Sequence, residues 1–206
     1  MRALGLIVRA RLPTAACFAP DLIRPTGGTH MTDRQPTEVT NLDRYGNPVL
    51  PWSMAHDLLA FGPNGPLVGF FLGTVRPGGR PDAAGVGAVW HDGDLYFTSG
   101  PGTRKARNLA SNPACTISVK LPGMDLTLSG EAVQVTEPAI LERVASIYRG
   151  IGWPAEVTAD GDGFTAPYSA PSAGPPPWHL YRFTFDTVVG LSTTEPNGAT
   201  RWRFDR

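Results

Sequence analysis

Residues 83–113 read AAGVGAVWHDGDLYFTSGPGTRKARNLASNP. Apolar and aromatic residues dominate 83–90 and 95–99, and the four residues HDGD between them are typical of a tight turn that joins two antiparallel strands. Thr103 is a favourable N-cap for a helix, which the Asn-Pro pair at 112–113 would end. The stretch therefore predicts a β-hairpin followed by a short helix.

The predicted helix carries positive charge at its unfavourable end. Arg104, Lys105 and Arg107 lie in the first turn, where each exposed cation costs about 0.3–1 kcal/mol against the helix dipole. A bound anion would make the cations favourable at this end of the helix, because the free backbone N–H groups and the cations would then both contact the ligand. Gly100 and Gly102 favour an anion site because small residues let a ligand approach the backbone. The alternative is three solvated cations whose charges are screened by salt.

The rest of the chain is predicted to consist mainly of strands. Gly130 lies inside an alternating run and indicates a bulge or a corner. Hairpin-length links predominate, which favours a mainly β (α+β) fold, an antiparallel barrel with short peripheral helices, over a doubly wound sheet. The expected strands are 66–75, 83–90, 95–99, 115–121, 125–135 and 180–193. Three helices are expected: one from Trp52 to a stop at Gly62-Pro63, one from Thr103 to a stop at Asn112-Pro113, and one from Pro138 to a stop at Gly150.

The N-terminal part of the chain is expected to lie outside the folded domain. Residues 1–30 are interpreted as a disordered leader or an over-extended start, with Met31 as the initiator, and a targeting peptide is the alternative. Residues 31–51 are polar and contain proline, which favours an irregular arm. We therefore expect a leader and arm over 1–45 and one domain over 46–206.

Composition excludes several classes of function. The chain of 206 residues has 18 basic and 18 acidic side chains, so its net charge of zero indicates no nucleic acid or membrane partner. No apolar run reaches the ~18–20 residues that a transmembrane helix needs. Cys17 and Cys115 form no disulfide framework, which favours the cytoplasm. The scattered histidines offer no metal-ligand spacing; they are His30, His56, His91 and His179.

Motifs for nucleophilic or nucleotide chemistry are also missing. The sequence holds no G-x-S-x-G and no Ser-x-x-Lys, and GPGTRK lacks the spacing of either common phosphate-binding loop. Asp160 and Asp162 belong to no complete calcium loop. The sequence therefore identifies no catalytic residue, and Thr98 and Ser99 are the nearest candidates for a proton donor.

Two motifs carry a resemblance to a known family. RPDAAGVGAVW (80–90), followed by DGDLYFTSGPGTRKARNLASNP (92–113), resembles the FMN-binding split-barrel family that includes pyridoxamine 5'-phosphate oxidase and its flavin- or deazaflavin-dependent relatives. The likeness covers about 52–150 and, more loosely, the Trp-Arg-Phe at 202–204. It implies an antiparallel split β-barrel that binds FMN, or alternatively the deazaflavin coenzyme F-420. It also implies hydride transfer with a small organic substrate, and a homodimer with the cofactor at the interface.

The resemblance further implies cofactor-binding residues. Arg104 and Lys105 would hold the phosphate with Thr103 as a hydroxyl donor, and Phe97 would lie beside the ring system or its ribityl chain. Trp202 would reach the cofactor from the partner chain. The backbone of 85–87 would run along the isoalloxazine, and Asn108 would have a structural or phosphate-shell role. The full set implied by the resemblance is Gly85, Val86, Gly87, Phe97, Thr98, Ser99, Thr103, Arg104, Lys105, Asn108 and Trp202.

The chain also departs from the family pattern. Asp82 stands where many relatives carry His, and Ala84 and Val89 replace the Arg and Lys of true pyridoxamine phosphate oxidases. The C-terminus has no Arg-x-His motif, so a vitamin B6 phosphate is not the expected substrate. The Pro-rich loop 166–178 is either a lid over the substrate or a strap between subunits. A second functional hypothesis is a carrier or sensor that binds flavin or another anion without turnover.

Overall fold

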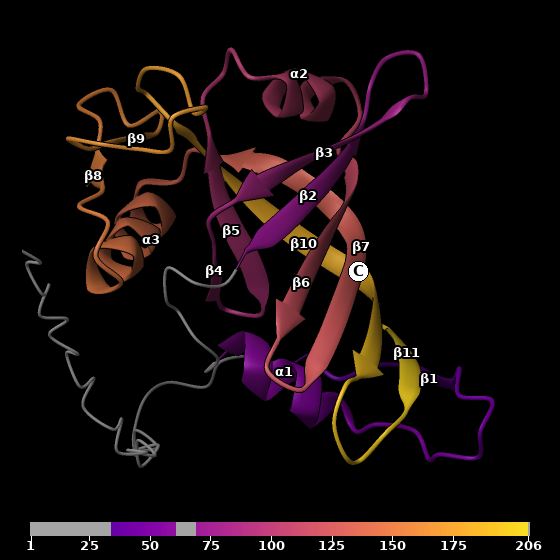
Figure 1. Cartoon of the computed structure of the whole chain (residues 1–206). Helices are drawn as coiled ribbons and strands as arrows, with labels where there is room; N and C mark the ends of the chain where they lie inside the picture. Colours follow the sequence, from indigo (N-terminus) through magenta and orange to yellow (C-terminus); the bar gives the residue numbers. More distant parts are fainter. Residues whose placement is uncertain (1–33, 61–68, 206) are drawn as a thin grey trace, which may run out of the picture. The chain divides into compact units, whose positions relative to one another are not determined.

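Antiparallel strands build the protein, as its computed structural model shows for residues 34–60 and 69–205 (Figure 1). The main sheet has the order β1-β11-β10-β7-β6-β2-β3, and β5 joins it to β4 by pairing with β10. All pairings are antiparallel, which confirms the predicted mainly β fold. The strands are β1 (Glu38–Asn41), β2 (Phe70–Val75), β3 (Pro81–Val86), β4 (Ala88–His91), β5 (Asp94–Ser99), β6 (Ala114–Leu121), β7 (Met124–Val135), β8 (Glu156–Val157), β9 (Phe164–Thr165), β10 (His179–Ser192) and β11 (Ala199–Arg203), and the helices are α1 (Trp52–Ala60), α2 (Arg104–Ser111) and α3 (Pro138–Gly150).

The barrel is split at Gly87. The sequence predicted one strand over 83–90, but the structure divides it into β3 and β4 at this residue. On one side Val86 pairs with Phe70 of β2, and on the other Ala88 pairs with Phe97 of β5. The two halves diverge because each finds a different partner strand, which apolar content alone does not indicate. The opening that results is the place where a ligand can reach backbone groups.

The β4–β5 hairpin turns as predicted. Asp92 and Gly93 at its tip have φ values of 48° and 81°, which are the two left-handed residues of a tight hairpin turn. Glycine adopts such angles without strain, and aspartate tolerates them better than most residues. The turn leads directly into β5, which ends at Ser99 next to the start of α2.

Gly130 marks a bulge, as the sequence predicted, but the extra residue lies on the facing strand. The register between β7 and β10 shifts between Phe185 and Thr187, so Asp186 is the bulged residue. A Cβ on Gly130 would lie 2.1 Å from the Thr184 carbonyl oxygen, so only glycine permits this approach of the two backbones.

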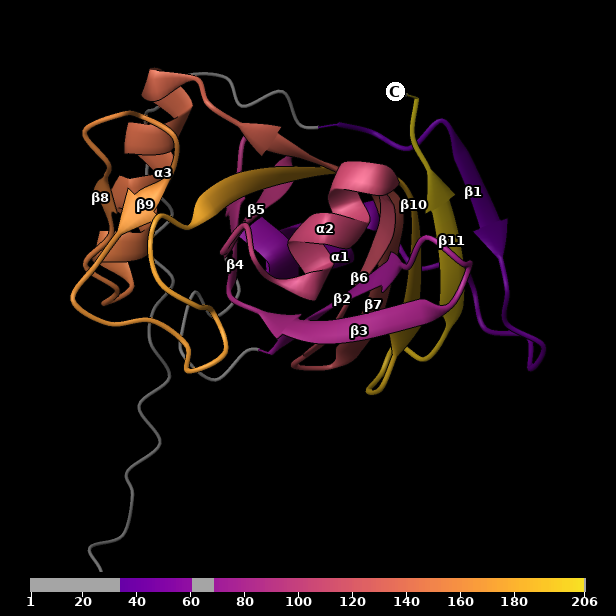
Figure 2. The ribbon, with the colours of Figure 1, turned by 90° about the horizontal axis from the view of Figure 1, so that it is seen from above.

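Two hydrophobic clusters hold the fold together. The larger fills the barrel, where Trp202 is fully buried and lies edge-on to Trp52 of α1 at 5.6 Å. The smaller joins α3 to the outside of β4 and β5, with Val144 and Tyr148 packed against residues such as Tyr96. Viewed from above, α2 lies across the barrel opening, with α1 behind it (Figure 2). The helices thus close the barrel ends and cover one side.

The predicted N-terminal arm contains a strand. β1 pairs with β11 at the edge of the sheet, with Val39 opposite Trp202. A four-residue, mostly exposed strand has little hydrophobic pattern, because an edge strand is defined by the backbone of its neighbour.

α3 extends one residue further than predicted, since Gly150 belongs to the helix and Ile151 is its C-cap.

Some predictions fall on residues that the structure does not describe. These are the leader over 1–30 with Met31, the Gly62-Pro63 helix stop and the first residues of the strand predicted over 66–75. The domain boundary at residue 46 stays a prediction. No helix within the described ranges is long and apolar enough to cross a membrane.

Candidate functional site

The start of α2 is built by hydroxyl groups at the end of β5. The Thr103 Oγ1 atom accepts a hydrogen bond from the backbone N–H of Ala106 at 3.3 Å, which confirms the predicted N-cap. The Ser99 and Thr103 hydroxyl oxygens lie 2.7 Å apart, so strand and helix are joined at this point. The turn between them closes with the Thr103 N–H bound to the Gly100 carbonyl at 3.0 Å.

Two of the three cations on α2 have partners within the protein. The Arg107 guanidinium donates to the Gly102 carbonyl at 2.7 Å, which folds this side chain back on the helix entrance. Arg104 is half-exposed and lies 3.9 Å from the Asp82 carboxylate. The same carboxylate accepts a hydrogen bond from Arg76 at 2.6 Å, and this bond lowers the pKa of Asp82. Local partners therefore compensate both arginines.

Lys105 differs from its neighbours. Within the described part of the chain its ammonium group makes no hydrogen bond and no ion pair, and burial lowers its pKa. It lies at the N-terminal end of α2, where the backbone N–H groups also lack intrahelical partners. Lys105 is therefore the cation available to an external anion.

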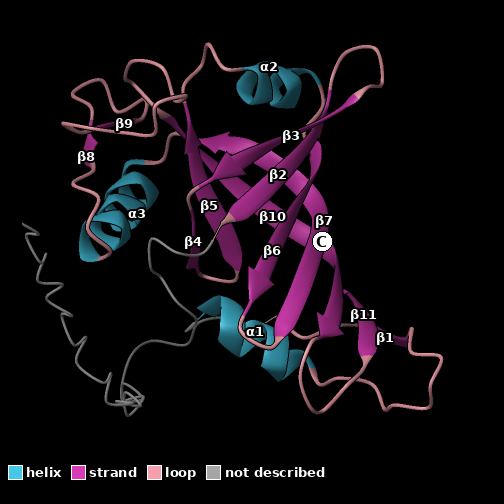
Figure 3. Ribbon diagram, viewed as in Figure 1, coloured by secondary structure: helices cyan, strands magenta, loops and turns pink. Residues whose placement is uncertain are grey.

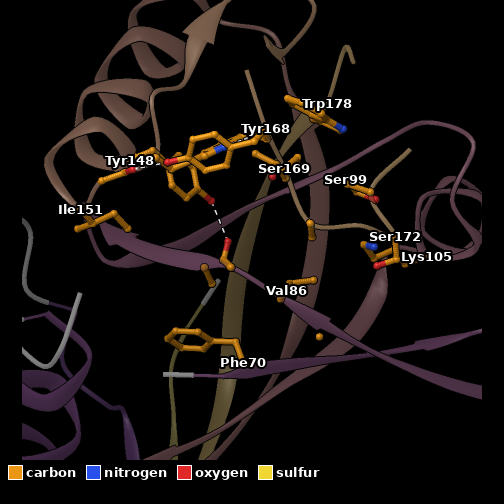
Figure 4. A pocket seen from close by; sticks show the side chains of 18 residues that line it. Phe70, Val86, Ser99, Lys105, Tyr148, Ile151, Tyr168, Ser169, Ser172 and Trp178 are labelled. Atoms are coloured by element: carbon orange, nitrogen blue, oxygen red, sulfur yellow. Dashed lines mark hydrogen bonds between the residues drawn. The ribbon is translucent and has the colours of Figure 1, made fainter. Parts of the chain in front are cut away.

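The side chain of Lys105 lines a cavity of about 550 Å³ (Figure 4). This is a typical volume for a small-molecule site. Among the described residues that line it, Lys105 is the only charged one. The lining comes from the β2–β5 strands, α2, the end of α3 and the loop before β10: Phe70, Gly85, Val86, Gly87, Ala88, Thr98, Ser99, Lys105, Tyr148, Ile151, Gly152, Trp153, Tyr168, Ser169, Ala170, Ser172, Ala173 and Trp178.

Two glycines lie in the strand segment that lines the cavity. A Cβ added to Gly85 or to Gly87 would meet no atom within 4 Å. Both residues belong to the segment that runs from β3 across the split into β4. The absence of side chains at these two positions leaves room for a flat group to lie against the strand.

The structure brings six of the residues implied by the family resemblance to this cavity. They come from three separate elements, and their role in binding stays a prediction. The six are Gly85, Val86, Gly87, Thr98, Ser99 and Lys105.

The other five implied residues lie elsewhere. Trp202 is fully buried in the barrel, so its ring cannot reach a partner chain as expected. Phe97 is also fully buried and stacks on Tyr181, with ring centroids 5.4 Å apart. Asn108 donates to the Thr74 hydroxyl at 2.9 Å in the interior, which favours the structural one of its two expected roles.

Thr103 and Arg104, the remaining two, flank the cavity without lining it. The Thr103 hydroxyl is engaged with Ser99 and the helix N-terminus. Arg104 lies toward Asp82. The predicted phosphate grip thus reduces to Lys105 in the cavity itself.

The sequence did not indicate that the end of α3 lines the site. The loop 166–178 was predicted to be either a lid over the substrate or a strap between subunits. In the structure this loop forms one wall of the cavity, and Figure 3 shows it as a long irregular segment beside α3. The contact depends on Gly100, where a Cβ would lie 2.3 Å from the Ala173 carbonyl oxygen.

Reciprocal hydrogen bonds hold this wall in place. The Trp153 indole N–H donates to the Tyr168 carbonyl at 2.8 Å, and the Tyr168 hydroxyl donates to the Gly152 carbonyl at 2.8 Å. At the far end of the loop, Trp178 and Phe164 exchange two backbone hydrogen bonds. The wall is therefore tied to the chain after α3 and to β9.

A comparison with family models identifies the protein class. The model described as pyridoxamine 5'-phosphate oxidase matches residues 68–192, which is more than half of the chain. The chain belongs to the pyridoxamine 5'-phosphate oxidase family. The match includes the strands from β2 to β10, all of α2 and α3, and the loop wall. A search of curated proteins gives no match.

Several solved structures resemble this family member. A pyridoxamine 5'-phosphate oxidase-related, FMN binding protein from Nostoc punctiforme is 17% identical, with a TM-score of 0.47 over 77% of this chain and 98% of that chain. An F420 reductase is 22% identical, with a TM-score of 0.44 over 64% and 94%. A NimC/NimA family protein from Clostridium acetobutylicum is 18% identical, with a TM-score of 0.47 over 65% and 82%.

Proposed function

We propose that the protein is a flavin-dependent oxidoreductase that binds FMN in the cavity and transfers a hydride to or from a small organic molecule. The observation that carries this proposal is Lys105, a cation without a partner among the described residues, at the N-terminus of a helix and in a cavity whose other described lining residues are uncharged. Membership of the pyridoxamine 5'-phosphate oxidase family supports a flavin as the ligand, because the sequence motifs resemble those of FMN-binding split barrels.

The residues of the cavity fit a phosphorylated flavin. Lys105 and the free N–H groups of α2 suit a phosphate, since cation, helix dipole and backbone donors all favour an anion. The absence of side chains at Gly85 and Gly87 suits a planar ring system. Thr98 and Ser99 also line the cavity, and polar residues of this kind suit a polyhydroxyl chain.

FMN is favoured over the deazaflavin coenzyme F-420. A longer, more negative cofactor tail needs further cations beside Lys105. Of the three further cations, Arg80 is exposed, Arg76 is bonded to Asp82 and Arg107 to the Gly102 carbonyl, and none of them lines the cavity. A cavity with one charged lining residue suits a ligand with a single phosphate, and coenzyme F-420 is the alternative.

The protein itself contributes binding and orientation. When bound, FMN supplies the redox chemistry by accepting or returning a hydride, and the organic substrate is correspondingly oxidised or reduced. No Asp, Glu, His or Cys occurs among the described lining residues, so we assign no proton donor or acceptor there. Tyr168, Trp153 and Trp178 also line the cavity, and their aromatic rings limit the access of water to it.

The vitamin B6 phosphates are not the proposed substrates. Ala84 and Val89 stand where pyridoxamine phosphate oxidases carry cations, and Val89 is buried in the cluster below α3. With Lys105 assigned to the cofactor, the described lining offers no cation for a second phosphate. We therefore propose a substrate without a phosphate group.

A homodimer with the site at its interface is also proposed. Phe71 on β2 is 58% exposed, an unusual position for a large aromatic ring. Its cross-strand neighbours are Gly85 on β3 and Ser118 on β6, so the ring stands above small residues. Because Gly85 also lines the cavity, a second copy packed on this face would lie beside the ligand.

A carrier or sensor is the second candidate function. It is favoured by the lack of a carboxyl, imidazole or thiol group among the described lining residues, because storage of a flavin needs none. Turnover separates the two candidates: an enzyme's bound flavin is reduced and reoxidised repeatedly by a suitable donor and acceptor. A carrier's bound flavin releases without such a cycle.

Absorption spectroscopy tests the main proposal. The purified protein is mixed with FMN or with coenzyme F-420, freed of unbound cofactor, and scanned. Two flavin bands retained with the protein support FMN, and one band at shorter wavelength supports the deazaflavin. Retention of neither cofactor contradicts the proposal.

A further inference from the structure

Tyr148 makes an unusual contact at the split of the barrel. Its hydroxyl donates to the Gly87 carbonyl at 2.9 Å, shown by a dashed line in Figure 4, and lies 3.3 Å from the Tyr96 carbonyl. The strand registers end at Val86 and resume at Ala88. Gly87 therefore has no ladder partner among the described residues, and a side chain from α3 supplies a hydrogen bond to its carbonyl group.

The position of this hydroxyl is fixed by packing. Tyr148 is 4% exposed, and its ring meets Trp153 edge-on at 5.0 Å and Phe164 edge-on at 6.2 Å. Burial raises the pKa of Tyr148, so the phenol keeps its proton and acts as a donor throughout the physiological pH range. The other described residues that join α3 to the barrel core, such as Val144 and Leu141, are apolar, and apolar packing does not orient a carbonyl group.

We propose that Tyr148 is a positioning residue of the site. Its hydroxyl holds the Gly87 carbonyl toward α3 and thereby sets which backbone groups between Gly85 and Ala88 face the cavity. This inference rests on the proposed function, in which that backbone runs along the flavin ring. Hydrogen bonds from the backbone to the ring alter the relative affinities for its oxidised and reduced forms, so Tyr148 adjusts both the affinity and the midpoint potential of bound FMN.

The test compares Tyr148→Phe with Tyr181→Phe. Both variants lose one hydroxyl and keep the ring, and no hydrogen bond of the Tyr181 hydroxyl occurs within the described residues. In the cofactor-free Tyr148→Phe protein, amide hydrogen exchange at 85–88 is expected to be about tenfold faster, since a hydrogen bond of this kind is worth up to about tenfold in an opening equilibrium. The FMN dissociation constant rises about tenfold, and the midpoint potential of bound FMN shifts.

The outcomes separate this inference from the proposed function. Unchanged exchange at 85–88 in Tyr148→Phe overturns the positioning role, as does faster exchange with unaltered FMN affinity and potential. Equal effects in Tyr181→Phe also overturn it, because they would report a general loosening of the core. If the wild-type protein retains no FMN, the proposed function fails, whereas exchange in the cofactor-free protein still tests the tie between α3 and Gly87. Thermal unfolding of both variants verifies that each is folded.

Discussion

Lys105 is the residue on which the proposed function depends most. Three cations in one helical turn look equivalent in the sequence, yet their surroundings differ. Arg104 lies near a carboxylate, Arg107 binds a carbonyl, and Lys105 enters the cavity without a partner in the described structure. A half-buried, uncompensated ammonium lowers stability and is expected where a ligand supplies the counter-charge.

Lys105→Met should separate binding from stability. Loss of a charge-assisted contact to phosphate is expected to weaken FMN binding about 10- to 100-fold. The cofactor-free variant should be slightly more stable than wild type, by about 2 °C in Tm, because a partly desolvated charge is removed. Titration by fluorescence and thermal unfolding measure the two effects. Arg107→Met is the matched control, and a comparable loss of affinity there would place the phosphate elsewhere.

The affinity for FMN should also depend on pH through Lys105. Burial lowers the pKa of this ammonium group, so it loses its proton at a lower pH than an ordinary lysine does. Phosphate binds the charged form, and affinity is therefore expected to fall as pH rises through the pKa of Lys105. Titrations at increasing pH measure this fall, which should be absent in Lys105→Met. A pH profile shared by both proteins would assign the effect to another group.

At the scale of the secondary-structure elements, the contacts of α2 with the sheet fix the position of the helix N-terminus at the cavity. Asn108 reaches from the helix to the Thr74 hydroxyl on β2, and both groups are buried. The sequence motif suggested either this structural role or a phosphate contact, and the geometry supports the first. A buried amide–hydroxyl pair orients the helix more strictly than apolar packing does, because it has one favourable geometry.

Asn108→Ala is therefore expected to destabilise the protein by about 1–3 kcal/mol, since it leaves the Thr74 hydroxyl buried and unpaired. Urea unfolding measures the loss. In a double-mutant cycle with Thr74→Val, the two changes should be coupled by about 1 kcal/mol. Ser111→Ala on the exposed side of the same helix serves as the control. Simple additivity of the Asn108 and Thr74 changes would contradict the assignment.

The bulge opposite Gly130 leads to a prediction about the stability of the β7–β10 strand pair. Gly130→Ala places a methyl group against the backbone of Thr184 and Phe185, which cannot move aside as a flexible side chain can. We expect a loss of stability of about 3 kcal/mol by urea unfolding. Gly78→Ala, where an added Cβ meets nothing within 4 Å, should change stability by less than about 0.5 kcal/mol. Equal effects of the two changes would contradict the bulge geometry.

For the whole molecule, the proposed dimer accounts for the exposed ring on β2. Phe71→Asp should convert a wild-type dimer to a monomer, because a carboxylate buried in an apolar contact is strongly disfavoured. Sedimentation velocity measures the change. Leu191→Asp alters another exposed apolar residue, on β10, and should leave the dimer intact. A monomeric wild-type protein, or a Phe71→Asp dimer, would refute the proposed interface.

Much of the fold follows from local chemistry. The Asp-Gly turn, the Thr103 cap and the Gly130 bulge were all predictable, because each depends on the conformational preferences of a few neighbouring residues. The antiparallel class followed from strands joined by short links. The break at Gly87 and the edge strand β1 were not predictable in this way. Each depends on which strand happens to lie alongside, and that strand comes from a distant part of the chain.

The candidate site shows the same division. The helix entrance with its excess of positive charge is evident from TRKAR at 103–107, so an anion site was foreseeable there. Which cation serves it is set by Asp82 and by the folding back of Arg107, and both are tertiary contacts. The wall formed by Trp153 and Tyr168 arises because α3 and the following loop return to the split barrel, although both residues lie more than 50 positions beyond the end of the hairpin at Ser99. Local sequence encodes the donor groups, but only long-range packing brings them to one cavity and leaves Lys105 without a counter-charge among the described residues.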